Sequence, residues 1–151
     1  MNPIQNILCP VDFSDSSEAA LDVALGLAAK LRGSVELFHV IQAPIYVGWE
    51  DSPAGLAATA EMLEVSRDRS KQQLDALAAK FGDRGAALRT TLQEGTPHHE
   101  IAERSKTVDL IVMGTHGRTG LPHLLLGSVA ERVVRTSVCP VLTVPVHKPA
   151  K

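Results

Sequence analysis

The residues best suited to chemistry in this chain lie between Val108 and Ser128. An apolar run, Leu110–Met113, has the length and branching of a strand buried on both faces. Small residues with the spacing G-x2-G-x9-G-S follow it, at Gly114, Gly117, Gly127 and Ser128. Such glycines let backbone N–H groups approach an anion, and a helix beginning there adds unpaired donors. The stretch predicts a phosphate-binding loop, although glycines that only shape a turn would leave the same pattern.

The spacing matches neither G-x4-G-K-[ST] nor G-x-G-x-x-G, so the P-loop and the dinucleotide fingerprint are both excluded. It resembles the nucleotide-binding signature of the universal stress protein family, in the branch that binds ATP. The segment from Asn6 to Ser14 resembles the first strand and turn of that family, and the segment from Val138 to Pro145 resembles its last strand. The resemblance therefore covers nearly the whole chain.

Strand-like and helix-like segments alternate along the 151 residues, which predicts a parallel α/β sheet with helices on both faces. The expected strands are 4–11, 34–41, 86–92, 110–113 and 141–144. Ser14 or Asp15 is expected to cap the first helix, with Glu18 at capping-box spacing from Asp15, and Gly33 to end it. The resemblance implies one Rossmann-like domain over residues 1–151, with an open five-stranded sheet in the order 3-2-1-4-5.

In open α/β sheets, ligands bind at the carboxyl ends of strands where the strand order reverses. The implied order brings Asp12 close to Gly114 at such a point. Asp12 is then either a turn residue that assists the helix cap or an acceptor that faces a ligand. The resemblance implies a nucleotide site formed by Pro10, Val11, Asp12, Val40, Ile41, Met113, Gly114, His116, Gly117, Arg118, Gly127, Ser128 and Val129.

Within this site the glycines and Val129 are expected to offer backbone N–H donors to phosphates, and Ser128 to add its hydroxyl and cap the last helix. Arg118 is a candidate for the terminal phosphates, with simple solvation as the alternative. Asp12 would accept from the ribose or hold a phosphate-bound Mg²⁺ (or Mn²⁺) through water. The resemblance implies backbone contacts to the base near Val40 and Ile41, while Met113 would line the sugar or base side.

The resulting hypothesis is a cytoplasmic stress-response protein that binds ATP with Mg²⁺ and acts as a sensor or switch on an unknown protein partner. Two alternatives remain: a slow ATPase or self-phosphorylating enzyme, and a nucleotide-free dimeric adaptor. No P-loop lysine and no clear general base are present, which argues against fast catalysis. The family loop often carries Arg or Lys where this chain has His123. A neutral imidazole attracts a triphosphate less strongly than a fixed cation would.

Composition favours no other large class of partner. The net charge is −2 without a basic block, so we expect no nucleic-acid binding, and no apolar run approaches membrane-spanning length. Residues 1–5 lack the features of a signal peptide, so we expect a cytoplasmic protein. Cys9 and Cys139 are expected to be packing residues inside buried strands, rather than disulfide or metal ligands.

The segment Val141–Val144 is short, apolar and, in the implied order, at a sheet edge. Such an edge invites pairing with a second copy, so we expect a homodimer joined through Val141, Leu142, Thr143 and Val144. Pro140 and Pro145 could instead blunt the edge and leave a monomer.

Three further features have simpler readings. Adjacent His98, His99 and Glu100 diverge on a helix and lack metal-ligand spacing. His39 is expected to be a core or half-buried histidine. Residues 42–55 form a long loop whose Tyr46 and Trp49 either cover a ligand or partner, or anchor the loop.

Overall fold

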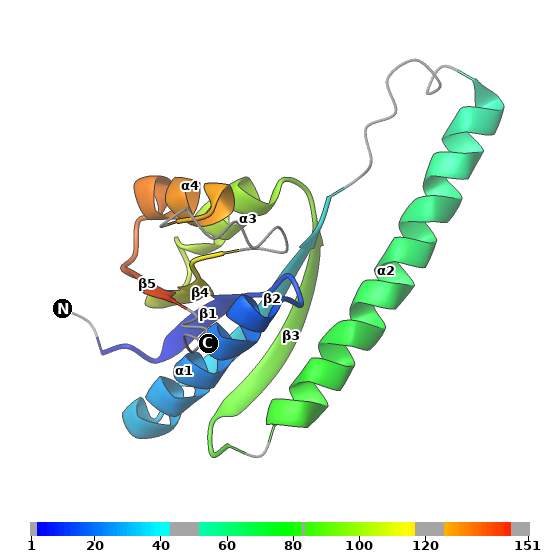
Figure 1. The fold of residues 1–151 in the computed structure, drawn as a ribbon. Helices are drawn as coiled ribbons and strands as arrows, with labels where there is room; N and C mark the ends of the chain where they lie inside the picture. Colours follow the sequence, from blue (N-terminus) through cyan, green and yellow to red (C-terminus); the bar gives the residue numbers. More distant parts are fainter. Residues whose placement is uncertain (1–2, 43–51, 83, 117–125, 146–151) are drawn as a thin grey trace, which may run out of the picture.

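The computed structural model describes residues 3–42, 52–82, 84–116 and 126–145. Within these ranges the chain forms a five-stranded parallel sheet in the order β3-β2-β1-β4-β5 (Figure 1). The strands are β1 (Asn6–Pro10), β2 (Ser34–Ile41), β3 (Ala87–Glu94), β4 (Leu110–Gly114) and β5 (Val141–Val144). The predicted α/β class, parallel sheet and strand order are confirmed.

Four helices are found in the described residues, and they cover both faces of the sheet. They are α1 (Asp15–Leu31), α2 (Pro53–Phe81), α3 (Pro97–Arg104) and α4 (Ser128–Thr136). Buried side chains of α1 and of the C-terminal half of α2 pack in one apolar cluster, and those of α3 and α4 pack in another. Figure 1 shows the N-terminal half of α2 projecting beyond the sheet.

The central strands β1 and β4 are buried on both faces, as the apolar runs predicted. Ile7 and Cys9 belong to the cluster under α1 and α2, whereas Leu8 between them belongs to the cluster under α3 and α4. Ile111 and Val112 divide between the clusters in the same way. This period of two follows from strand geometry, and each fully buried Leu or Ile contributes roughly 2 kcal/mol through the hydrophobic effect.

The start of α1 is capped by Ser14, the first of the two predicted caps. Its side chain accepts a hydrogen bond from the Ser17 N–H at 3.3 Å, which satisfies one unpaired donor of the first turn. The expected capping box between Asp15 and Glu18 does not form. Glu18 instead makes an ion pair with Lys80 in the last turn of α2 at 2.6 Å.

The residue that ends α1 in a left-handed conformation is not the glycine that the sequence predicts. The left-handed residue is Arg32, with φ of 56°, and not Gly33. Gly33 lacks a side chain for another reason, since a Cβ there would lie 2.5 Å from the backbone oxygen of Gln5. Gly33 therefore permits a close approach of two chain segments.

Cys139 lies outside β5, which begins at Val141, so its predicted place inside a buried strand is wrong. Pro140 separates it from the strand and has no backbone N–H to extend the ladder. Cys9 is fully buried in β1, and burial raises the pKa of its thiol. The Cys9 side chain thus behaves as an apolar packing group.

A buried carboxylate ties the α3 side of the sheet together. Glu36 of β2 is 2% exposed and accepts hydrogen bonds from Arg104 of α3 at 2.6 Å and from Arg89 of β3 at 2.7 Å. Burial raises the pKa of Glu36, but hydrogen bonds from Arg104, Thr91 and Arg89 more than offset this and hold that pKa below its ordinary value. The interaction joins β2, β3 and α3.

Replacing Glu36 with glutamine is expected to lower the free energy of unfolding at neutral pH by about 1–2 kcal/mol, since both arginines are partly exposed. The folded-state pKa is depressed, so the carboxylate stabilises the protein above its unfolded pKa and this contribution is lost as pH falls. The difference between wild type and Glu36→Gln should therefore shrink below pH of about 4.5. Urea unfolding across this pH range measures it, and a difference independent of pH would contradict the assignment.

Candidate nucleotide site

A pocket of about 420 Å³ opens at the carboxyl ends of β1, β2 and β4, within the range of small-molecule sites. Its walls come from the end of the sheet and from the N-terminal parts of α3 and α4. The lining residues are Pro10, Val11, Asp12, Ser17, Phe38, His39, Val40, Gln42, Pro97, Ile101, Met113, Gly114, Thr115, His116, Gly127, Ser128, Val129 and Ala130.

Asp12 lines this pocket and lies two residues after the end of β1. Its Oδ1 accepts hydrogen bonds from the Ser14 N–H at 3.1 Å and from the Ser14 hydroxyl. Of the two alternatives for Asp12, the structure shows the role in the turn. The same side chain also lines the pocket, so the turn fixes the direction of a carboxylate that faces the cavity.

The end of β4 is held tightly against α1. A Cβ on Gly114 would lie 2.3 Å from the Ser16 hydroxyl oxygen and 2.8 Å from the Ser16 backbone oxygen, distances that no side chain tolerates. The backbone N–H of His116 donates to the same Ser16 hydroxyl at 3.4 Å. Gly114 is thus required for packing, whatever it contributes to a ligand.

The N-terminus of α4 faces the pocket without a capping side chain. Gly127, and not the predicted Ser128, is the N-cap, and within the described residues the helix start has no side-chain cap hydrogen bond. Gly127 has φ of −68° and its N–H donates to Thr115 O at 2.6 Å, so its conformation needs no positive φ. Uncapped first-turn N–H groups and the helix dipole make this end attractive to an anion.

The other half of the pocket is apolar. Phe38 and Val40 of β2, Ile101 of α3 and Met113 of β4 line it, together with Pro97. Phe38, Ile101 and Met113 belong to the buried cluster under α3 and α4, so this wall is rigidly packed. One cavity thus joins an apolar slot to a polar, anion-attracting end.

Fixed positive charge is scarce here, since no Lys or Arg is among the described lining residues. Among the lining residues, Thr115 Oγ1 lies 2.8 Å from Nδ1 of His116. Nor do any three His, Cys, Asp or Glu side chains gather into a metal-ligand set in the described ranges. Among the described lining residues, the donors available to a phosphate are therefore backbone N–H groups and hydroxyl groups such as that of Ser128.

Every predicted site residue that is described lines the pocket except Ile41. Ile41 is buried, and its backbone oxygen accepts from the Gly95 N–H at 3.0 Å. Gly117 and Arg118 lie outside the described residues, as do His123, Tyr46 and Trp49. The structure adds residues that sequence reasoning missed, namely Ser17, Phe38, His39, Gln42, Pro97, Ile101, Thr115 and Ala130.

The position of the α3 residues among these could have been inferred from the strand order. The helix after β3 must cross to β4, on the far side of β1, because the order is β3-β2-β1-β4-β5. A crossover of that span passes over the ends of the central strands, which brings Pro97 and Ile101 to the cavity. Topology, and not residue type, carries this information.

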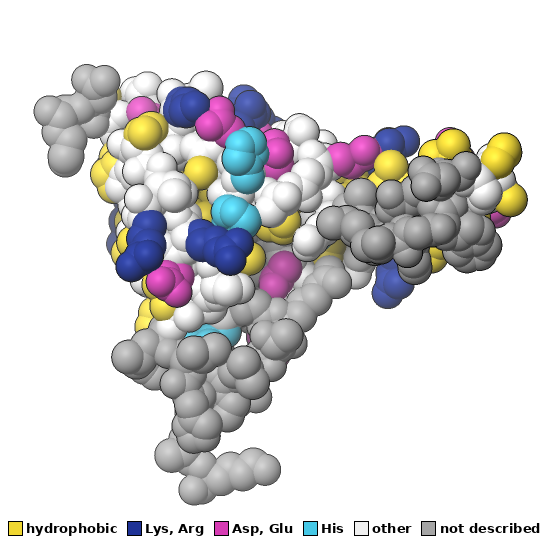
Figure 2. Space-filling model, turned by 90° about the horizontal axis from the view of Figure 1, so that it is seen from above, with side chains coloured by type: hydrophobic (Ala, Val, Ile, Leu, Met, Phe, Trp, Pro, Cys, Tyr) yellow, Lys and Arg dark blue, Asp and Glu magenta, His cyan; other side chains and the backbone are white. Residues whose placement is uncertain are grey.

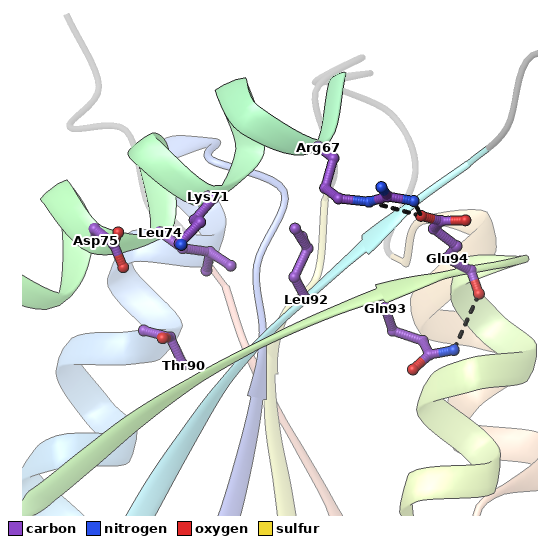
Figure 3. A pocket seen from close by; sticks show the side chains of 8 residues that line it. All are labelled: Arg67, Lys71, Leu74, Asp75, Thr90, Leu92, Gln93 and Glu94. Atoms are coloured by element: carbon purple, nitrogen blue, oxygen red, sulfur yellow. Dashed lines mark hydrogen bonds and ion pairs between the residues drawn. The ribbon is translucent and has the colours of Figure 1, made fainter. Parts of the chain in front are cut away.

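A second hollow, of about 530 Å³, lies between α2 and β3 (Figure 3). Leu74 and Leu92 lie between the two elements, and Arg67 of α2 pairs with Glu94 of β3. Its charges are mixed, with Lys71 and Asp75 also on its walls. It lies on the outer strand, away from the point where the strand order reverses, so its larger volume does not make it the better ligand site.

The surface around the strand ends shows no dominant sign of charge. Figure 2 looks onto the molecule from above the view of Figure 1, and its described part mixes Lys and Arg with Asp and Glu side chains. Among the helices that the structure describes, none is long and apolar enough to cross a membrane.

Comparison with known proteins assigns the chain and its fold to a family. A profile of the universal stress protein family matches residues 3–145. Universal stress protein MJ0531 of Methanocaldococcus jannaschii is 36% identical over 152 residues, covering 99% of this chain and 86% of the relative. Universal stress protein MJ0577 of the same organism is 31% identical over 156 residues, covering 93% and 94%. The chain belongs to the universal stress protein family.

Solved structures agree with this assignment. The structure of MJ0577 superposes with a TM-score of 0.83 at 30% identity, covering 97% of this chain and 99% of that one. A universal stress protein in complex with cAMP has a TM-score of 0.64 at 24% identity, covering 95% and 98%. One from Archaeoglobus fulgidus in complex with dAMP has a TM-score of 0.63 at 20% identity, covering 95% and 98%. The last two likenesses concern the fold alone.

Proposed function

We propose that this universal stress protein binds ATP, or another adenine nucleotide, in the pocket at the ends of β1, β2 and β4. The observation that carries the proposal is the uncapped N-terminus of α4, which shares one cavity with Asp12 and with an apolar slot. An anion-attracting end joined to an apolar slot matches a nucleotide, which has a charged tail and a flat base. The protein would act as a nucleotide-dependent sensor or switch.

Each part of the pocket suits one part of the ligand. The phosphates would lie at the first turn of α4, near the Ser128 and Val129 N–H groups. Asp12 would accept from the ribose or, through water, hold a Mg²⁺ or Mn²⁺ ion carried by the phosphates. The base would enter the apolar part of the pocket between Val40 and Ile101, beside the backbone at the carboxyl end of β2.

The relatives support adenine as the base. Two universal stress proteins of this fold were solved with adenine nucleotides, cAMP and dAMP. Their identity to this chain is low, so the stronger support for a nucleotide comes from the pocket that this chain itself forms. The proposal includes a cytoplasmic location, where ATP is available, and a downstream protein partner.

Small molecules that co-purify with the protein test the proposal. Protein purified from cells should release an adenine nucleotide on denaturation, in an amount that approaches one per chain and is identified by mass. Gly127→Val protein prepared in parallel should release far less. Equal amounts from both proteins, or a different class of molecule, would count against the assignment.

Hydrolysis of bound ATP is expected to be slow, well under about one turnover per second. The reason is that no Lys or Arg lines the described pocket to stabilise charge on the transferring phosphoryl group. Phosphate release measured with a coupled assay checks this. A rate typical of enzymes that is abolished by Asp12→Ala would make the slow-ATPase alternative the correct one and the protein an enzyme.

A homodimer through β5 remains part of the proposal. The strand forms an edge of the described sheet and its Leu142 is 40% exposed. Light scattering after size exclusion should give twice the monomer mass, and Leu142→Asp should give monomers. Leu31→Asp, at a similarly exposed leucine ending α1, should leave the dimer intact. A wild-type monomer would favour blunting of the edge by Pro140 and Pro145.

A further inference from the structure

The last residue before Asp12 is fastened to β2 through both of its backbone polar groups. The Val11 N–H donates to Phe38 O at 2.8 Å, and Val11 O lies 2.7 Å from Nδ1 of His39. A carbonyl oxygen can only accept, so Nδ1 of His39 carries the hydrogen. His39 is 8% exposed, and at that burial an unmade hydrogen bond at Val11 O would be costly.

The residue after Asp12 is held by the same histidine. Phe13 adopts φ of 64°, a left-handed conformation that is unfavourable for a residue with a large side chain. Its ring centroid lies 4.5 Å from that of His39, with an angle of 41° between the rings. The contact between the two rings helps to offset the energetic cost of the left-handed backbone conformation at Phe13.

We infer that His39 is a positioning residue for Asp12. It binds Val11 through a hydrogen bond and contacts the ring of Phe13. Both residues adjacent to Asp12 in the chain are therefore fixed in place. The Asp12 carboxylate, oriented further by Ser14, then faces the cavity in one direction. The expected effect of His39 on nucleotide affinity rests on the proposed function. The positioning of Asp12 by His39 applies to the ligand-free protein as well.

Two substitutions separate the contacts that His39 makes. His39→Asn keeps a donor, because the amide nitrogen of asparagine is the same number of bonds from Cβ as Nδ1. His39→Phe keeps a ring beside Phe13 and loses the donor. ATP affinity should fall about tenfold in His39→Phe and stay within about threefold in His39→Asn. Thermal unfolding of each variant shows whether it remains folded at the titration temperature.

A double-mutant cycle with Asp12→Ala tests whether His39 acts through Asp12. If it does, His39→Phe should weaken ATP binding in the wild-type background and have little further effect in the Asp12→Ala background. If His39 only fills the core, both backgrounds should lose the same factor. Equal losses would overturn the inference even where nucleotide binding itself is sound.

Hydrogen exchange in the ligand-free protein keeps the test independent of the proposed function. The Ser14 N–H, which donates to Asp12, should exchange about tenfold faster in His39→Phe than in wild type, with His39→Asn between them. Unchanged exchange in His39→Phe would overturn the inference. Faster exchange in a protein that binds no nucleotide would uphold the positioning role while removing ATP as its purpose.

Discussion

Replacing Gly114 with valine is expected to lower the free energy of unfolding by about 3 kcal/mol, the upper part of the range for overpacked sites. The first side-chain atom alone would lie 2.3 Å from the Ser16 hydroxyl oxygen and 2.8 Å from the Ser16 backbone oxygen. Ser16 belongs to the first turn of α1, so relief requires α1 or β4 to move. The midpoint and slope of urea unfolding measure the loss.

Gly26 provides the matched control for this experiment. It lies in the middle of α1 and a Cβ there would meet nothing within 4 Å. Gly26→Ala should raise the free energy of unfolding by about 0.5–1 kcal/mol, because alanine loses less backbone entropy in a helix. A Gly114→Val protein as stable as wild type would show that β4 and α1 do not approach as closely as described.

Replacing Gly127 with valine is expected to weaken ATP binding by about 100-fold or more, equivalent to about 2.7 kcal/mol. The backbone of Gly127 has φ of −68° and ψ of 158°, which valine adopts readily, and its N–H bond to Thr115 can persist. The fold should therefore survive, at a cost near 1 kcal/mol for a poorer helix cap. The branched side chain would stand where phosphate approaches the first turn of α4.

Titration calorimetry and circular dichroism together measure this outcome. Ser128→Ala is the control, since it removes a hydroxyl and leaves the backbone donors in place, so its affinity should fall only a few-fold, about 1 kcal/mol or less. Unchanged affinity in a folded Gly127→Val protein would remove the N-terminus of α4 from the site.

The part of the fold that sequence predicts best is the part with local signals. The apolar runs of β1 and β4 are short, branched and bounded by turn residues, and both strands are buried on two faces. Thr96 and Pro97 predict the start of α3, and Thr96 is its N-cap. The strand order itself came from family resemblance, because nothing in a single strand's sequence identifies its neighbour.

Other features of the structure depend on contacts distant in sequence, which local patterns do not reveal. The sequence pattern suggests that Gly33 ends the helix, yet glycine is required there because the Gln5 backbone lies too close to allow a side chain. Gly114 looks like a phosphate-loop glycine, yet Ser16 already excludes a side chain there. Each case needed the partner segment to be known.

His39 shows how position and role can separate. Its burial could be predicted from the apolar residues around it in β2, and the structure confirms that it is a core histidine. Its contact with the residues on either side of Asp12 could not, because α1 separates β1 from β2 in the sequence and only the structure shows which of their residues lie side by side.

The most direct test of the central claim is a calorimetric titration of ligand-free protein with ATP and Mg²⁺, with GTP as comparator. The account predicts saturable binding of one ATP per chain, tighter than GTP, and loss of that heat in Gly127→Val. No heat with ATP, and no displacement of a labelled adenine nucleotide at concentrations up to about 1 mM, a dissociation constant that corresponds to only about 4 kcal/mol, would contradict it.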